Sequence, residues 1–103
     1  MLVAGSGADT LVATGIAGTV MTGGAGADTF AFPNQMGHDV VTNFGLAKDT
    51  LQFSATLFAN FSAAMAAASR IGLNTVFSID ASDAVQLNNV TKTSLTASNF
   101  HFV

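Results

Sequence analysis

The sequence predicts a mainly β protein, in which a short parallel β-roll continues into an antiparallel, sandwich-like C-terminal cap with one α-helix. Three observations lead to this fold class. All six acidic residues are Asp, which prefers turns and caps to helix surfaces. A glycine-rich nonapeptide occurs twice near the N-terminus, and repeats this short are typical of β-solenoids. Short runs of alternating apolar and polar residues, typical of strands, follow further along the chain.

Composition limits the classes of function. The chain has 103 residues, which is enough for one domain with a modest core, and half of its residues are hydrophobic. Only three cations, Lys48, Arg70 and Lys92, stand against a net charge of −3, which argues against nucleic-acid binding. The absence of cysteine excludes disulfides and thiolate metal sites. The longest weakly polar run, residues 57–68, is too short to span a bilayer, so no membrane insertion is expected.

The repeat is carried by AGSGADTLV (residues 4–12) and GGAGADTFA (residues 23–31), which align without gaps. The stretch between them, residues 13–22, keeps two glycines but has no Asp. We expect each unit to form a glycine turn followed by a short strand, so that residues 1–32 form a truncated β-roll. Turns two repeats apart stack on the same side of a roll, which would bring the Asp residues of the two copies together.

Residues 33–103 are predicted to form the cap. No polar linker separates them from the repeats, so the two parts are expected to make one continuous structural domain. A helix is predicted over residues 57–71, because its alanines and apolar face favour helix and Gly72 provides a stop. Strands are expected at residues 39–44, 49–53, 74–79, 84–90 and 99–103, the third and fourth of them forming a hairpin.

The glycine turns have the composition of a Ca²⁺ site. Ca²⁺ takes about six to eight oxygen ligands from carboxylates and backbone carbonyls. One turn supplies too few, but two stacked turns would complete the shell. The predicted ligands on this side are the carboxylates of Asp9 and Asp28 and the carbonyls near Gly5, Gly7, Gly24 and Gly26.

A site on the opposite side of the roll is a weaker prediction. The middle repeat has Gly18 or Thr19 where an Asp should fall, so such a site would need Asp39. Asp39 either joins a Ca²⁺ site at the end of the roll or caps its own turn. The repeated turns themselves would also form without metal, with Asp accepting backbone N–H groups. Asp49 is interpreted as a turn residue, and Asp80 and Asp83 as the turn of the hairpin.

Two other classes of function compete with metal binding. Two histidines, no Cys and no Glu leave few acid–base groups, so the chain is not expected to be an enzyme. A surface-adhesion or carbohydrate-binding module is one alternative, although the chain lacks Trp and Tyr, the usual sugar-stacking residues. A self-association domain is the other, because an unpaired end of a roll invites a homodimer through residues 1–32.

The two repeats resemble the nonapeptide G-G-x-G-x-D-x-U-x of the RTX, or haemolysin-type calcium-binding, repeat proteins. The second copy fits every position, and the first has Ala4 in place of the opening glycine. The downstream order of ADTFAF, GHDVVTNF and KDTLQFS before a helix and an aromatic tail also resembles the C-terminal region of this family. The likeness covers nearly the whole chain.

The resemblance implies a parallel β-roll that binds Ca²⁺ between its turns and folds outside the cell. It also implies a secreted, extracellular bacterial protein that is exported through an uncleaved C-terminal signal. Its partners would then be the type I secretion machinery and the upstream part of a larger parent protein. The chain departs from the family at Asn43 and Asn99, where acids are usual, and in its Asp-free middle repeat. These departures lower the expected number of ions to about one or two.

Overall fold

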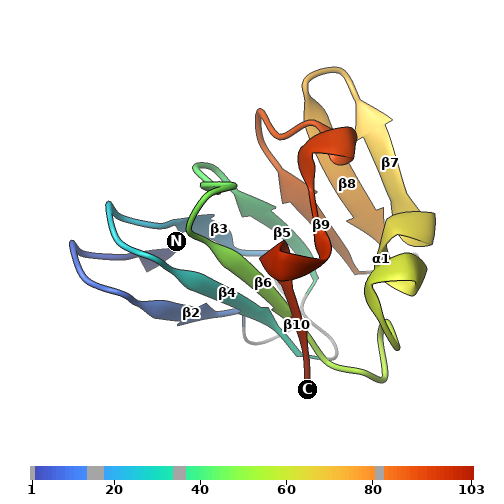
Figure 1. Ribbon diagram of the computed structural model, residues 1–103, viewed down its shortest axis with the longest axis horizontal. Coiled ribbons are helices and arrows are strands. Elements are labelled where there is room, and N and C mark those ends of the chain that lie inside the picture. Colours follow the sequence, from blue (N-terminus) through green and yellow to red (C-terminus); the bar gives the residue numbers. More distant parts are fainter. Residues whose placement is uncertain (1, 14–17, 34–36, 81–82) are drawn as a thin grey trace.

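The computed structural model describes residues 2–13, 18–33, 37–80 and 83–103 of the chain. Within these ranges the protein is mainly β, with two sheets and one α-helix (Figure 1). The first strands are β1 (Leu2–Val3), β2 (Thr10–Val12), β3 (Val20–Thr22), β4 (Thr29–Phe32), β5 (His38–Val41) and β6 (Thr50–Phe53). There follow α1 (Phe61–Ala67), β7 (Ala68–Ile71), β8 (Asn74–Ser78), β9 (Ala84–Leu87), the 3-10 helices Lys92–Ser94 and Ala97–Asn99, and β10 (Phe100–Phe102).

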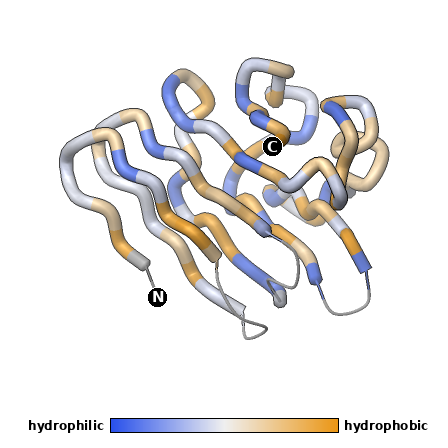
Figure 2. The backbone as a smooth tube through the Cα atoms, turned by 90° about the horizontal axis from the view of Figure 1, so that it is seen from below, coloured by the Kyte–Doolittle hydropathy of each residue, from blue (hydrophilic) through white to orange (hydrophobic). Residues whose placement is uncertain are grey.

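Successive strands from β1 to β6 alternate between the two sheets. The larger sheet has the order β1-β3-β5-β9-β8-β7 and the smaller one the order β10-β6-β4-β2. All pairs among the first six strands are parallel, with Thr10 opposite Thr29 and Thr29 opposite Thr50. Because the chain visits each sheet once per pass, equivalent loops stack along the same edge. Figure 2 shows these passes side by side, with the N-terminus at one end of the stack.

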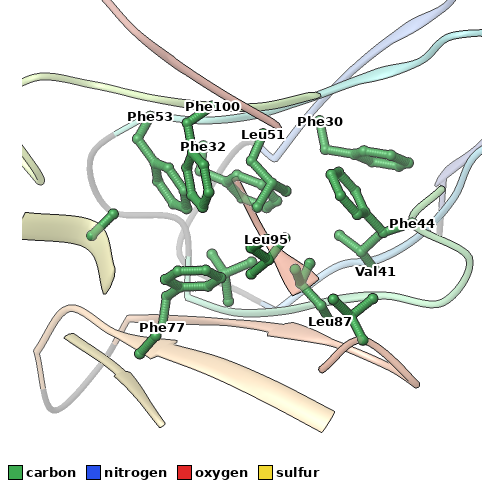
Figure 3. Close-up of a cluster of buried hydrophobic side chains, with 14 of the residues drawn as sticks. Phe30, Phe32, Val41, Phe44, Leu51, Phe53, Phe77, Leu87, Leu95 and Phe100 are labelled. Carbon is green, nitrogen blue, oxygen red and sulfur yellow. The ribbon is translucent and has the colours of Figure 1, made fainter. Parts of the chain in front are cut away.

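The two sheets enclose one hydrophobic core between them (Figure 3). Phe30, Phe32, Leu51 and Phe53 point inward from the smaller sheet, and Val41, Phe77 and Leu87 face them from the larger one. This alternation is the period of two that a strand with one buried face requires. The inward-facing side chains form one continuous apolar layer that packs the two sheets against each other.

Phe53 lies at the centre of an aromatic cluster within this core. Its ring centroid is 5.3 Å from that of Phe32, 5.1 Å from that of Phe58 and 5.8 Å from that of Phe77. These separations are within the range at which aromatic pairs attract one another. The cluster therefore joins the repeat segment, which supplies Phe32, to the C-terminal segment, which supplies Phe77.

The predicted helix over residues 57–71 is too long. The helix spans Phe61–Ala67 and is capped by Asn60, whose Oδ1 accepts the N–H of Ala63 at 2.9 Å. Residues 68–71 form strand β7 instead, because they pair antiparallel with β8. Gly72, with φ of 61°, makes the tight turn of this hairpin and does not end the helix.

The predicted strands at residues 49–53, 74–79 and 99–103 correspond, to within one residue at each end, to β6, β8 and β10, and the one over 84–90 is β9, which ends earlier, at Leu87. The strand predicted over 39–44 is β5, which ends earlier, at Val41. The antiparallel cap is only partly correct, because antiparallel pairing in the described residues is confined to β7, β8 and β9. Strands β9 and β10 instead extend the sheets in parallel, beside β5 and β6. They satisfy backbone groups that the last parallel strands would otherwise leave unpaired.

Candidate metal centre

Three loops stack on the edge where the chain passes from the larger sheet to the smaller one. We call residues 4–9 the first loop, residues 23–28 the second loop and residues 42–49 the third loop; they are the blue, light-blue and green tips in Figure 1. Backbone hydrogen bonds of the strands continue into these loops. The N–H of Thr29 donates to the carbonyl of Asp9 at 2.8 Å, and that of Thr50 to the carbonyl of Asp28 at 2.9 Å.

Each of these loops ends in an Asp directly before a strand. Asp28 Oδ1 accepts the backbone N–H of Asp9 at 3.1 Å, and Asp49 Oδ1 accepts the N–H of Asp28 at 2.9 Å. The prediction that Asp9 and Asp28 lie together is confirmed. The cause is the register of β2 and β4, which places Thr10 beside Thr29 and therefore the preceding aspartates beside each other.

The second carboxylate oxygens of two of these residues have no partner. Oδ2 of Asp9 and Oδ2 of Asp28 are buried and accept no hydrogen bond within the described residues. The whole Asp28 side chain is buried, with 1% of its surface exposed. A buried carboxylate oxygen without a donor is costly unless a positive charge lies nearby. These two oxygens therefore have the environment of cation ligands.

The four glycines of the predicted site meet in the gap between the first and second loops. A Cβ atom at Gly24 would collide with the carbonyl oxygen of Gly5, and one at Gly26 with the carbonyl oxygen of Gly7. Gly5 and Gly7 themselves have open space at the position of a Cβ. The second loop thus needs glycine for close approach, whereas the first loop contributes carbonyl oxygens that face it.

Asp39 lies at the opposite edge of the sheets, and the structure does not bring it to Asp9 or Asp28. Its Oδ1 accepts the N–H of Thr19 at 2.7 Å, and its Oδ2 is buried without a hydrogen-bond partner. Asp39 therefore lies beside the position where the middle repeat lacks an Asp. Burial raises the pKa of Asp39, and the nearby charge of Asp83 raises it further. The hydrogen bond from the N–H of Thr19 and the charge of His38 act in the opposite direction and lower this pKa.

Asp49 and Asp83, which the sequence pattern indicates only as turn residues, take places in these stacks that the pattern does not reveal. Both are buried, and Asp83 Oδ1 accepts the N–H of Gly37 at 2.8 Å. Asp83 N–H in turn donates to Asp80 Oδ1 at 2.8 Å, as the predicted hairpin turn requires. Asp49 and Asp83 can be recognised in the sequence by their position directly before a strand, which is also the position of Asp9 and Asp28. This signal does not require a glycine repeat around the Asp.

The donor set of the candidate site is all oxygen. The described residues contain no group of three or more His, Cys, Asp or Glu side chains that could hold a metal ion. A cation between the first two loops would therefore depend on two carboxylates and on backbone carbonyls. This combination suits Ca²⁺, which accepts carbonyl oxygens and irregular geometry, better than it suits Zn²⁺.

No family model and no curated protein sequence matches the chain. In the part of the chain that the structure describes, no helix has the length and apolar character needed to cross a membrane.

Proposed function

We propose that the chain is a non-enzymatic Ca²⁺-binding module in which strands β1 to β6 belong to a short parallel β-roll of the RTX type. One observation carries the proposal: Asp9 and Asp28, at the ends of two stacked glycine loops, each have a buried Oδ2 without a hydrogen-bond partner. A divalent cation bound by both oxygens would offset both desolvated charges at once. The carbonyl oxygens of Gly5 and Gly7, which face the second loop at Gly24 and Gly26, would add neutral ligands.

The affinity of this site is expected to be weak. Two carboxylates are fewer than a high-affinity Ca²⁺ loop provides, and affinity rises with the number of charged ligands. A Kd on the order of 10⁻⁴–10⁻³ M is typical of extracellular modules. Such a site is empty at cytosolic Ca²⁺ concentrations and filled outside the cell. Binding would then stabilise the folded state by linkage only after export.

The biological setting follows from the resemblance of the repeats to RTX proteins. In this proposal the module caps a β-roll at the C-terminal end of a larger secreted protein and carries the signal for type I secretion. The fold of the upstream part and the type I machinery would be its partners. A test is whether residues 33–103, fused to a reporter in bacteria with a type I system, direct the reporter to the medium.

Thermal unfolding tests the metal site directly. When free Ca²⁺ is ten times Kd, binding stabilises the folded state by about 1.4 kcal/mol. For a domain of this size that corresponds to a rise in Tm of roughly 6–11 °C over the value in chelator. Mg²⁺ at the same concentration should have a smaller effect, because it demands stricter octahedral geometry. An unchanged Tm in millimolar Ca²⁺ would overturn the proposal.

We also propose that the same end of the molecule supports self-association. Strands β1 and β2 are the end strands of the two sheets, so each has one partner strand among the described residues. Val3 and Val12 on these strands are 67% and 41% exposed. A cavity of about 330 Å³ beside them is lined by residues of the first loop, including Gly5 and Asp9. A second copy pairing with these strand edges would cover both valines.

A further inference from the structure

The second loop has two neighbours, and its gap toward the third loop differs from its gap toward the first. In the gap toward the third loop, the backbone of the second loop is hydrogen-bonded to side chains. Asn43 accepts the N–H of Gly23 through Oδ1 at 2.7 Å and donates Nδ2 to the carbonyl of the same glycine. Lys48 donates its Nζ to the carbonyl of Ala25. Two backbone carbonyls of the second loop are thus bound by donors of the protein itself.

The third loop also satisfies its own polar groups. The carbonyl of Gly45 accepts the N–H groups of Lys48 at 3.1 Å and Asp49 at 2.8 Å. Asp49 Oδ2 accepts the N–H of Gly45 at 2.7 Å, while its Oδ1 accepts the N–H of Asp28. Both carboxylate oxygens of Asp49 therefore have donors. This distinguishes Asp49 from Asp9 and Asp28, which have the equivalent position before a strand.

We infer that the third loop is a metal-independent clamp, in which the Lys48 ammonium and the Asn43 amide occupy the gap that a cation would otherwise bridge. The inference rests on the proposed Ca²⁺ site, which it confines to the gap between the first two loops on this edge. It also explains the chemistry of Asn43. An Asp at this position would accept the N–H of Gly23 but would have no donor for the carbonyl.

The clamp has a consequence for binding. Because the third loop holds the second loop without metal, Asp28 is already in place when Ca²⁺ arrives. The first loop then supplies the second carboxylate, that of Asp9, whose Oδ2 is buried without a hydrogen-bond partner. Preorganising half of a site in this way lowers the entropic cost of binding. The clamp thus makes a site with only two carboxylates usable.

Amide hydrogen exchange of the full chain, measured by NMR in chelator and in Ca²⁺, tests this inference. Three amides report on the two gaps: Gly23 and Asp28 donate to the third loop, and Asp9 donates to Asp28. In chelator we expect Gly23 and Asp28 to be at least about tenfold more protected than Asp9, and Ca²⁺ to raise mainly the protection of Asp9.

Substitution of Lys48 isolates the role of its charge. Lys48→Met keeps the aliphatic stem but removes the charge. In chelator it should lower the amide protection of Gly23 and Asp28 about fivefold, which corresponds to the loss of about 1 kcal/mol from an exposed charged interaction. Lys48→Arg, which keeps a donor, should restore it. Lys92→Met is the matched control, because Lys92 Nζ also donates to a backbone carbonyl, that of Ala68 at 2.9 Å, away from these loops.

The outcomes separate the two proposals. Equal exchange at Gly23 and Asp9 in chelator, or identical protection in Lys48→Met and Lys92→Met, would overturn the clamp. If Ca²⁺ changed the amide protection of Asn43 and Lys48 as much as that of Asp9, the clamp would also be overturned. If Ca²⁺ changes none of these amides while Gly23 stays protected in chelator, the metal site is wrong and the clamp stands.

Discussion

Asp28 binds the backbone N–H of Asp9 with one carboxylate oxygen, at 3.1 Å, and keeps the other oxygen buried without a partner. The first contact ties the two glycine loops together, whereas the second oxygen lies beside Gly23 of the second loop and accepts no hydrogen bond within the described residues. Asp28 is therefore both a structural link between the loops and a candidate ligand. These two roles can be separated, because an amide can replace the first but not the second.

Asp28→Asn should remove the response to Ca²⁺ without unfolding the protein. Asn keeps an oxygen that accepts the N–H of Asp9, but it carries no charge. In chelator the variant should be at least as stable as the wild type, because a buried charge has been removed. Thermal unfolding with and without Ca²⁺ measures both effects. Asp80→Asn, outside the loops, should keep the full shift in Tm, and a full shift in Asp28→Asn would contradict the assignment.

Gly24→Ala should destabilise the fold far more than Gly5→Ala. A methyl group at Gly24 meets the carbonyl oxygen of Gly5, which is backbone and cannot move aside, whereas a methyl group at Gly5 enters open space. Overpacking of this kind costs about 1–3 kcal/mol, while Gly5→Ala should stay within about 0.5 kcal/mol. Urea unfolding in chelator compares the two. Equal effects would mean that the loops do not stack as closely as described.

The stability difference between the wild type and Asp39→Asn should depend on pH. Burial raises the pKa of Asp39 above its usual value of 3.8, so the folded state holds this proton at pH values where the unfolded state has lost it. The contribution of Asp39 to the free energy of unfolding is therefore greatest below pH 3.8 and declines as the pH rises through the raised pKa. Asn has no such titration. Urea unfolding in chelator over this range measures the difference, and a flat or rising difference would refute the prediction.

Phe53→Ala should weaken the whole molecule, not one part of it. Phe53 is fully buried and contacts Phe32 of the repeat segment and Phe77 of the C-terminal segment. Loss of such a ring costs about 3–5 kcal/mol. Circular dichroism and the fluorine or methyl NMR signals of the core should report the same single unfolding transition, with its midpoint lowered. Leu73→Ala, at a residue 72% exposed, is the control and should change little. Separate transitions for residues 1–32 and 33–103 would contradict a shared core.

Val12→Lys should reduce self-association. Val12 lies on β2, the end strand of the smaller sheet, and a charge on an end strand opposes pairing with another strand. Light scattering and sedimentation should show a dimer that grows with concentration for the wild type and a monomer for the variant. A wild type that stays monomeric at high concentration would remove this proposal and leave the metal site unaffected.

The sequence alone identified the loops of the candidate site and the pairing of Asp9 with Asp28. It could do so because their requirements are local: glycine where one backbone approaches another, and Asp directly before a strand. The same local reasoning placed most strands, because alternation with a period of two is visible over four or five residues. It failed at residues 68–71, where alanine-rich sequence favours helix but pairing with β8 decides the conformation.

Only the tertiary structure decided which of the equivalent aspartates keeps a carboxylate oxygen without a hydrogen-bond donor. Asp28 and Asp49 occupy the same position before a strand, yet Asp49 has donors on both oxygens and Asp28 on one. The difference lies at Oδ2: Asp49 accepts the N–H of Gly45 there, whereas the N–H of Gly23, the glycine beside Asp28 Oδ2, donates to Asn43 instead. A carboxylate oxygen is a candidate ligand only when the surrounding fold leaves it without a donor, and for Asp28 that depends on a contact between residues twenty positions apart, the pairing of Gly23 with Asn43.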